Sequence, residues 1–274
     1  ATLNAVIHAG LRPVFCDIDP DTWTMCPRAL EKVLNEHPGV KVVMPVNVFG
    51  VPPDIGDVAG QKTVVVDDAH GFGSGGGSPA DARAYSLHAT KILPAAEGGL
   101  LTSKDAGLLE AVRRLRNHGL TEDLLDSQPG FNEKLSELHA AVGLSSLRAL
   151  PAVMARRKQY ATRLRGFIKE KCGGAFALQK IPAGVETNHQ NLGVLCQAGA
   201  EKCQRDLESR GVGSRRYFYP PLHRLRFVDN PPRLPNTDRV ADSILCLPLH
   251  SRMEEETLAR IEQALLETSG SLPG

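Results

Sequence analysis

The chain has 274 residues, of which 42% are hydrophobic, enough for one large domain and a smaller one, each with its own core. Its 32 basic and 31 acidic residues give a net charge of +1, which argues against a nucleic-acid partner or an anionic membrane surface. The six cysteines show no metal-site spacing, and no apolar run approaches the ~18 residues of a membrane helix. We therefore expect a cytoplasmic protein that binds neither nucleic acid nor membranes.

The first part of the chain alternates between helix and strand patterns. Apolar residues spaced three or four apart predict helices, and short apolar runs bounded by turn residues predict strands. In chain order these are an opening helix that ends at Gly10, a strand over residues 12–18, a helix from Pro27, a strand over 40–46 buried on both faces, a short helix over 54–60, and strands over 63–66, 82–87 and 99–102. This order is typical of an α/β fold with a mostly parallel sheet flanked by helices.

A helix is predicted between residues 102 and 116. Thr102 and Asp105 have the spacing of a capping box, which marks the start of a helix. The helix is expected to bury one apolar face, formed by Leu108, Leu109, Val112 and Leu115.

Two more helices are predicted in the middle of the chain. The first covers residues 133–147, and Pro151 begins the second, over 152–169. Basic residues 156–158 of the second helix are expected to form a solvated face. The inward-facing side chains of the first helix are expected to be Leu138, Ala141, Val142 and Leu144.

A glycine break at Gly173 and Gly174 predicts a domain boundary. Residues 1–170 then form the large domain, including a linker helix, and residues 171–274 form a smaller α+β domain. The elements expected in the smaller domain are a strand over 191–196, a helix over 200–210, a helix over 237–244, a strand over 246–249 and a helix over 254–267.

The residues that carry chemistry lie between residues 63 and 99. Asp67 ends an apolar strand, Ser86 ends the next strand, and Lys91 follows in a polar turn. In open α/β sheets, ligands bind at the carboxyl ends of the strands, so these side chains are expected at one edge. A carboxylate, a hydroxyl and an amine are the groups that pyridoxal phosphate needs for its ring nitrogen, its phosphate and its aldehyde.

Other readings of the motifs are weaker. The glycines Gly71, Gly73 and Gly76 have the spacing of a dinucleotide-binding loop, but they lead into a strand, where that motif requires a helix. The chain has no G-x-S-x-G motif of a nucleophile-elbow hydrolase, and its histidines have no metal-ligand spacing.

Motifs along nearly the whole chain resemble those of the DegT/DnrJ/EryC1/StrS aminotransferases, which are pyridoxal-phosphate enzymes of fold type I. The segments that carry the resemblance are N-A-V-I-H-A-G-L-R-P-V-F-C-D-I-D from Asn4, V-D-D-A-H-G-F-G from Val66, Y-S-L-H-A-T-K from Tyr85, G-F-N-E-K-L from Gly130 and Y-P-P-L-H from Tyr219.

The resemblance implies a role for five residues. Lys91 would form the Schiff base with the cofactor and move the proton during transfer, and Asp67 would keep the ring nitrogen protonated. His70 matches a position beside the cofactor ring, and Ser86 matches the phosphate-binding serine. Asn132 matches a residue that reaches the phosphate in the neighbouring subunit, which implies a homodimer with shared active sites.

Three further positions follow from the same resemblance. Lys134 stands where the family often has arginine, and it is a candidate for substrate binding. His223 is a second candidate on the substrate side, with a loop cap as the alternative. Asp68 occupies a position that usually holds a small residue.

The family aminates keto sugars carried on nucleotides, so we expect an aminotransferase with pyridoxal 5'-phosphate as cofactor and glutamate as amino donor. Lysine at position 91 favours transamination over the dehydration catalysed by relatives with histidine there. One alternative is a cyclitol ketone as acceptor. Another is a truncated, non-catalytic homologue with a binding or regulatory role, because the family's N-terminal phosphate-binding helix start and ring-stacking aromatic residue do not precede Ala1.

Overall fold

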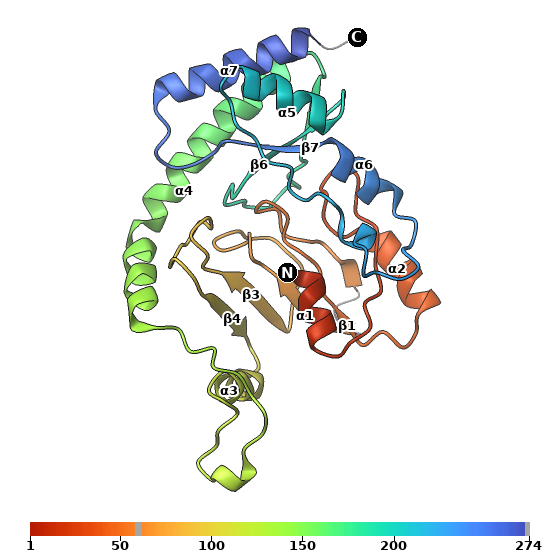
Figure 1. Cartoon of the computed structure of the whole chain (residues 1–274), viewed down its shortest axis with the longest axis vertical. Helices are drawn as coiled ribbons and strands as arrows, with labels where there is room; N and C mark the ends of the chain where they lie inside the picture. The colour runs from red at the N-terminus through yellow and green to blue at the C-terminus, as the bar shows by residue number, and fades with distance from the viewer. Residues whose placement is uncertain (58–61, 272–274) are drawn as a thin grey trace.

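The computed structural model describes residues 1–57 and 62–271, which form two sheets with helices around them (Figure 1). The strands are β1 (Val42–Val43), β2 (Thr63–Asp67), β3 (Ala82–Ser86), β4 (Gly99–Ser103), β5 (Phe176–Leu178), β6 (Leu192–Cys196) and β7 (Ile244–Leu247). The α-helices are α1 (Thr2–His8), α2 (Pro27–Glu36), α3 (Ala106–Leu115), α4 (Glu137–Lys171), α5 (Ala200–Ser209), α6 (Pro235–Ser243) and α7 (Glu255–Gly270).

The larger sheet has the strand order β1-β2-β3-β4. The first three strands are parallel, and Asp67 of β2 lies opposite Ala84 of β3. β4 is antiparallel to β3, so the sheet is mixed, with three parallel strands and one antiparallel edge strand. The predicted α/β class and the strands over 63–66, 82–87 and 99–102 are confirmed.

The strand predicted over residues 12–18 is wrong. This segment makes one isolated bridge, between Ile18 and Met25, and otherwise runs alongside the sheet without pairing. Its Asp17 carboxylate instead accepts hydrogen bonds from the backbone N–H groups of Asn236 (3.1 Å) and Thr237 (2.9 Å). These groups lie in the first turn of α6, where backbone donors lack helical partners, so the segment caps a helix.

The strand predicted over residues 40–46 is shorter than expected. Only β1 is regular, with a single further bridge from Val46 to Asp67. β1 is an edge strand of this sheet, which explains why Val42 is exposed although the sequence predicted burial on both faces. The helix predicted over 54–60 falls partly on residues 58–61, which lie outside the described residues.

The N-cap residue of α3 differs from the predicted one, and the apolar face that was expected to be buried is not. The Asp105 carboxylate accepts a hydrogen bond from Leu108 N (3.1 Å), so Asp105 and not Thr102 is the N-cap. No residue of α3 is buried, because the helix belongs to a projection that extends from the body of the molecule (Figure 1). We call this projection, residues 106–135, the arm.

α4 is one helix of 35 residues, where the sequence predicted two. It begins after Ser136, whose hydroxyl accepts from His139 N (3.3 Å), and Pro151 lies inside it. Proline removes one backbone hydrogen bond, here to the carbonyl of Leu147, at a cost of about 3 kcal/mol. The helix continues because the part from Leu150 onward is held in the core, by Leu150, Ala161, Leu164 and Ile168.

The first half of α4 is exposed, contrary to the predicted inward face. Leu138 is 81% exposed, and the other exposed apolar side chains are Val142, Leu144 and Leu147. By length and composition, one 18-residue window of α4 with a mean hydropathy of 1.3 is apolar enough to cross a membrane. Long helices of soluble folds meet the same criterion, so this one helix is weak evidence for a membrane span.

The basic run over residues 156–158 is only partly solvated. Arg157 is buried, and it donates to the backbone carbonyls of His189 (3.0 Å) and Gln190 (2.5 Å). Burial lowers the pKa of its guanidinium to about 10, so it remains charged at neutral pH. Two carbonyl acceptors meet that charge, and the predicted solvated face is wrong for this residue.

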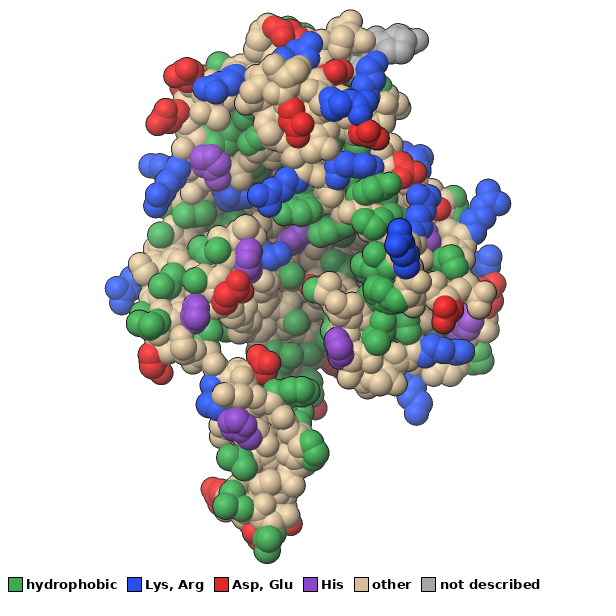
Figure 2. Space-filling model, viewed as in Figure 1, with side chains coloured by type: hydrophobic (Ala, Val, Ile, Leu, Met, Phe, Trp, Pro, Cys, Tyr) green, Lys and Arg blue, Asp and Glu red, His purple; other side chains and the backbone are tan. Residues whose placement is uncertain are grey.

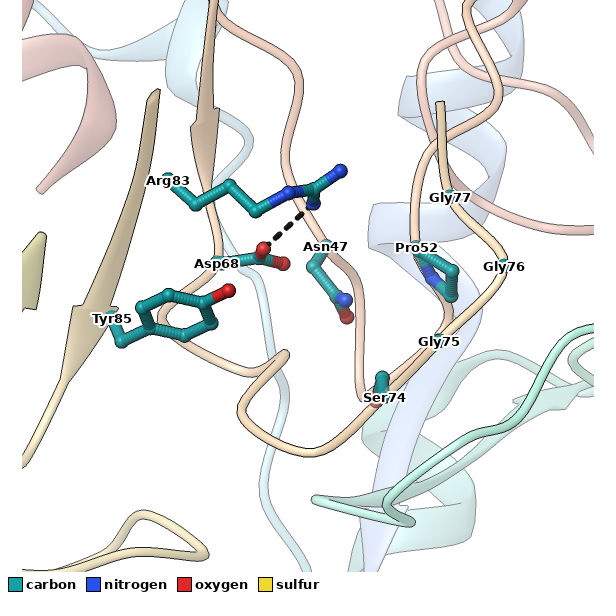
Figure 3. A pocket seen from close by; sticks show the side chains of 9 residues that line it. All are labelled: Asn47, Pro52, Asp68, Ser74, Gly75, Gly76, Gly77, Arg83 and Tyr85. Carbon is teal, nitrogen blue, oxygen red and sulfur yellow. Dashed lines mark hydrogen bonds and ion pairs between the residues drawn. The ribbon is translucent and has the colours of Figure 1, made fainter. Parts of the chain in front are cut away.

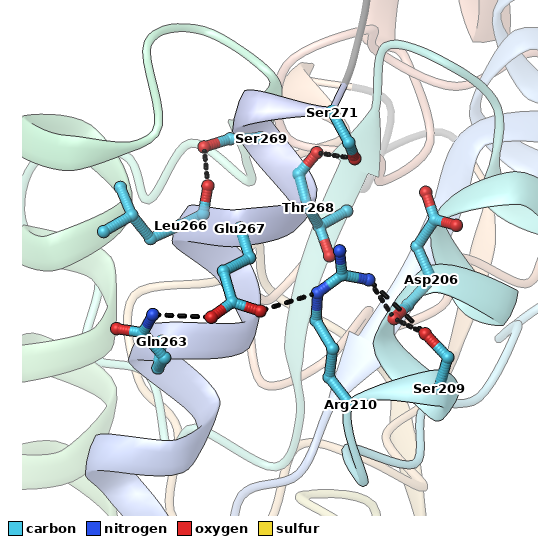
Figure 4. A network of polar contacts seen from close by, with 9 residues as sticks. All are labelled: Asp206, Ser209, Arg210, Gln263, Leu266, Glu267, Thr268, Ser269 and Ser271. Atoms are coloured by element: carbon cyan, nitrogen blue, oxygen red, sulfur yellow. Dashed lines mark hydrogen bonds and ion pairs between the residues drawn. The ribbon is translucent and has the colours of Figure 1, made fainter.

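The smaller sheet has the order β5-β6-β7 and packs against α5 and α6, while α7 packs against α4 and α5. Its strands are antiparallel, and β6 and β7 are buried throughout. A polar network ties the helices together, with Arg210 Nε donating to Glu267 Oε2 (3.0 Å) and Gln263 Nε2 to Glu267 Oε1 (2.6 Å) (Figure 4). The α+β content expected for residues 171–274 is thus present, while the domain boundary itself stays a prediction.

The two sheets meet through a small aromatic core. Gly193 of β6 lies against Phe49 and Trp23, whose rings pack edge to face with centroids 6.3 Å apart. A Cβ added at Gly193 would lie 2.8 Å from an atom of each ring. Only glycine therefore allows β6 to approach these rings so closely.

Gly193→Ala is expected to destabilise the protein by about 1–3 kcal/mol, because the added methyl group overpacks this core. The matched control is Gly166→Ala in α4, where nothing lies within 4 Å of the new Cβ. That change is expected to stabilise by about 0.4–1 kcal/mol. Urea unfolding of both variants measures the free energy of unfolding, and equal values would contradict the close packing at Gly193.

Candidate functional site

The candidate site lies at the carboxyl ends of β2 and β3. The two strands are parallel, with Asp67 opposite Ala84, so Asp67 and Ser86 reach the same edge of the sheet. Lys91 follows β3 in a turn in which its backbone N–H donates to the carbonyl of His88 (2.9 Å). The face shown in Figure 2 is hollowed near its centre, with histidine and basic side chains gathered around the hollow.

The Asp67 carboxylate is held by two donors. Thr2 Oγ1 donates to Oδ2 (2.5 Å), and Ala69 N donates to Oδ1 (3.1 Å). Thr2 belongs to α1, which lies across the front of the sheet in Figure 1. The two bonds together fix the direction of the carboxylate. The contact with Thr2 was not predicted, because 65 residues separate the two side chains.

Lys91 is half-buried beside this carboxylate. Burial lowers the pKa of its amine, and the negative charge of Asp67 opposes the shift without cancelling it. The two groups therefore act on one another electrostatically, as expected from their positions in the sequence. A lowered pKa increases the fraction of free amine at neutral pH, which is the form that attacks a carbonyl carbon.

His70 is buried among aromatic rings. Its ring is nearly parallel to those of Phe49 (centroids 5.9 Å apart, 23°) and Phe218 (5.7 Å, 21°). Burial, followed by the positive charge of Lys91, lowers the pKa of His70 to about 4, while Asp67 acts in the opposite direction. The imidazole is therefore neutral at pH 7. Phe49 and Phe218 were not predicted as site residues.

Ser86 presents its hydroxyl at the turn that leads to Lys91. Its Oγ accepts a hydrogen bond from His88 N (3.3 Å). His88 Nδ1 in turn lies 2.9 Å from Thr90 Oγ1, so side-chain bonds order this turn from within. The hydroxyl hydrogen of Ser86 remains free to donate to an anion at the sheet edge.

The structure does not bring Asn132, Lys134 and His223 to this group within one chain. Asn132 and Lys134 lie exposed on the arm, where Lys134 Nζ donates to Asn132 Oδ1 (2.6 Å). His223 is buried, with Nε2 3.0 Å from Asp238 Oδ1 of α6. That contact is the one expected of a loop cap. The binding roles of these three residues stay predictions.

Asp68 faces a separate pocket of about 210 Å³, lined also by Asn47, Arg83 and Tyr85 (Figure 3). Arg83 donates to Asp68 Oδ2 (2.8 Å), so the carboxylate at this position, which usually holds a small residue in the family, is paired with a guanidinium. Arg83 and Tyr85 alternate along β3 with Ser86, which places the pocket on the other face of that strand. Asp68 is thereby separated from Lys91, which favours Asp67 as the acid of the site.

The site thus combines an oriented carboxylate, an amine with a lowered pKa, a neutral imidazole and a free hydroxyl. These groups fit pyridoxal phosphate, because the carboxylate suits a protonated ring nitrogen, the amine suits the aldehyde and the hydroxyl suits the phosphate. A metal site is not indicated, since the described residues contain no group of three or more histidine, cysteine or acidic side chains placed to bind one ion.

Comparisons with known proteins agree with this chemistry. A dTDP-4-amino-4,6-dideoxy-D-glucose transaminase of Escherichia coli is 29% identical over 97% of this chain and 76% of its own length. The solved structure of the aminotransferase TlmJ from Streptoalloteichus hindustanus matches with a TM-score of 0.90 and 26% identity, over 98% of this chain and 76% of that one. DesI, solved in the presence of its TDP-sugar product, matches with a TM-score of 0.88 and 30% identity, over 98% and 72%.

These matches confirm the predicted fold of pyridoxal-phosphate aminotransferases. The model of the DegT/DnrJ/EryC1/StrS aminotransferase family matches residues 1–266, which is nearly the whole chain. The chain therefore belongs to the DegT/DnrJ/EryC1/StrS aminotransferase family, whose members depend on pyridoxal phosphate.

Proposed function

We propose that this aminotransferase uses pyridoxal 5'-phosphate to move an amino group from glutamate to a keto sugar carried on a nucleotide. The observation that carries the proposal is the placement of Asp67 and Lys91 at one sheet edge, where each charge acts on the other. The choice of acceptor is supported by the relatives, since one is a transaminase of a dTDP-linked sugar and another was solved with a TDP-sugar product.

The cofactor, when bound, supplies an aldehyde that accepts amines and a ring that withdraws electrons from the substrate carbon. Asp67 would hold the proton on the ring nitrogen, and Thr2 keeps its carboxylate in position for that bond. Ser86 would donate to the phosphate, and His70, neutral and held by its aromatic neighbours, would lie beside the ring.

Lys91 has two tasks in this proposal. Its amine would hold the cofactor aldehyde, which requires the unprotonated form that burial favours. When it is released by an incoming amine, the same nitrogen would serve as the base that takes a proton from the substrate carbon and as the acid that returns it. A half-buried position suits both tasks, because water competes less for the proton.

We propose further that the active protein is a homodimer with shared sites. Large apolar side chains are exposed along the arm and the first half of α4, namely Leu120, Leu124, Leu125, Phe131, Leu138, Val142, Leu144 and Leu147. An apolar surface of this kind is typical of an interaction site. A second copy that covers it would bring the arm, and with it Asn132, toward the neighbouring site.

The first test is spectroscopic. The protein mixed with pyridoxal phosphate is expected to gain a near-visible absorbance band, and Lys91→Ala is expected to abolish it and to lower amino-group transfer at least about 10²–10⁴-fold. Lys104→Ala, at an exposed lysine, is the matched control and should keep both. Absence of the band in the unmodified protein would contradict catalysis and favour a non-catalytic binding protein.

The same assay separates the two classes of acceptor. Keto sugars linked to a nucleotide are expected to have a higher kcat/KM than cyclitol ketones with glutamate as donor. The reverse order would contradict the sugar acceptor and leave the aminotransferase chemistry intact.

Shared sites are tested by mixing two inactive variants. In a dimer of Lys91→Ala with Asn132→Asp, one site has both defects and the other has neither, so activity is expected to return on mixing. Asn132→Asp places a negative charge against the phosphate, and its own defect should shrink as the cofactor concentration rises. Mixed dimers without activity, once isolated through a different affinity tag on each variant, would contradict a site that Asn132 of one subunit completes in the other.

His70 predicts a dependence of stability on pH. Its pKa is about 4 in the folded chain against 6.5 ordinarily, so the unfolded chain binds more protons between those values. The free energy of unfolding therefore decreases as the pH is lowered through this range. His70→Gln is expected to reduce the loss of unfolding free energy between pH 7 and pH 4.5 by about 2–3 kcal/mol. His37→Gln, at an exposed site, should retain the full loss in urea unfolding, and an equal loss in all three proteins would contradict a buried neutral imidazole.

A further inference from the structure

One side-chain amide binds the backbone on both sides of Lys91. Gln190 Oε1 accepts a hydrogen bond from Ile92 N (2.8 Å), and Gln190 Nε2 donates to the carbonyl of Thr90 (2.9 Å). Gln190 is only 7% exposed and lies about a hundred residues further along the chain. Neither bond belongs to a regular element, so the amide takes the place that a neighbouring strand would have.

The chemistry of the two partners fixes the orientation of this amide. The N–H of Ile92 can only donate and the carbonyl of Thr90 can only accept, so the oxygen of Gln190 must face Ile92 and its nitrogen must face Thr90. A side chain that lacks a donor or an acceptor cannot make both bonds. If neither bond is made, the buried N–H of Ile92 and the part-buried carbonyl of Thr90 are left unpaired on either side of Lys91.

The segment that carries Gln190 is itself held firmly. Arg157 of α4 donates to the carbonyls of His189 and Gln190, and the N–H of Gln190 donates to Asn188 Oδ1 (2.8 Å). Asn188 Nδ2 donates to the carbonyls of His70 (2.8 Å) and Phe72. The same three residues, 188–190, therefore bind both loops of the candidate site, the one that follows Asp67 and the one that carries Lys91.

We propose that Gln190 is a positioning residue for Lys91, whose amide fixes the backbone on both sides of the lysine and so sets where the amine meets the cofactor. The inference rests on the proposed function for its catalytic meaning, but the contacts that carry it are present without the cofactor. Gln190 acts on Lys91 through the backbone of the loop.

Position matters here because Lys91 must reach first a carbonyl carbon and then a carbon-bound proton. A displacement of about 1 Å can lower such rates about 10²-fold. The other bonds of this turn are local: Lys91 N donates to the carbonyl of His88 (2.9 Å), and His88 Nδ1 lies 2.9 Å from Thr90 Oγ1. These bonds order the turn, but they do not relate it to the segment that carries His70.

The test compares Gln190→Ala with Gln179→Ala, first without cofactor. Gln179 is a matched control, since it is 5% exposed and binds the backbone carbonyls of Thr22 (2.7 Å) and Val48 (3.1 Å), away from Lys91. Hydrogen exchange at the Ile92 amide is expected to be at least about tenfold faster in Gln190→Ala, because its acceptor is lost. pH-dependent acylation of Lys91 is expected to shift to higher pH, as the amine becomes more hydrated. Gln179→Ala should change neither.

With cofactor and amino donor, Gln190→Ala is expected to lower kcat about 10–100-fold while the KM for the donor changes little. Gln190→Met is similar in length and lacks both the amide donor and the amide acceptor, so it supplies the same measurements if the alanine variant does not fold. Wild-type exchange at Ile92 and wild-type acylation of Lys91 in the folded variant would overturn the proposal. Failure of the unmodified protein to bind cofactor would instead refute the proposed function, while the two cofactor-free measurements still decide the role of Gln190.

Discussion

The parallel pairing of β2 with β3 is the constraint on which the site depends. It brings Asp67 and Ser86 to one edge, but parallel strands need a crossover, and residues 68–81 cross over without a helix or strand of their own. Their backbone groups must find partners elsewhere. Some lie nearby, as where Ser78 N donates to the carbonyl of Pro53 (3.2 Å), and the C-terminal half supplies others, through Glu186, which pairs with Gly75, and Asn188, which binds two carbonyls. The later part of the chain therefore closes on the site because the crossover lacks a helix.

This closure also explains the electrostatics of the site. Burial lowers the pKa of both Lys91 and His70, so the Asp67 carboxylate faces two groups whose neutral forms are favoured. Thr2 and Ala69 donate to that carboxylate, which fixes its position beside these two groups. Fixed charge on one side and a movable proton on the other is an arrangement suited to transamination.

The parts of the site that the sequence predicted are those with local patterns. Asp67 and Ser86 end apolar strands, and Lys91 follows in a recognisable motif, so spacing alone places them together. Thr2 and Gln190 could not be found this way, because their contacts span 65 and 98 residues and leave no periodic trace. Two wrong predictions, the helix break at Pro151 and the solvated Arg157, have the same origin. Core packing of α4 keeps the helix continuous through Pro151. The carbonyls of His189 and Gln190 accept hydrogen bonds from Arg157, which offsets the free-energy cost of its burial. Tertiary contacts overrode the local preference in both cases.

The long helix α4 links the stability of the folded chain to the formation of the proposed dimer. Its second half is held by the core and by Arg163, which binds Glu262 of α7 (2.7 Å), whereas its first half has apolar side chains in solvent. Helices in water gain most of their stability from packing, so the first half gains little from this chain alone. In the proposed dimer, the surface that needs covering runs directly into the arm that carries Asn132. The contact that stabilises the helix would then also deliver Asn132 to the partner's phosphate site, and assembly and cofactor binding would reinforce one another.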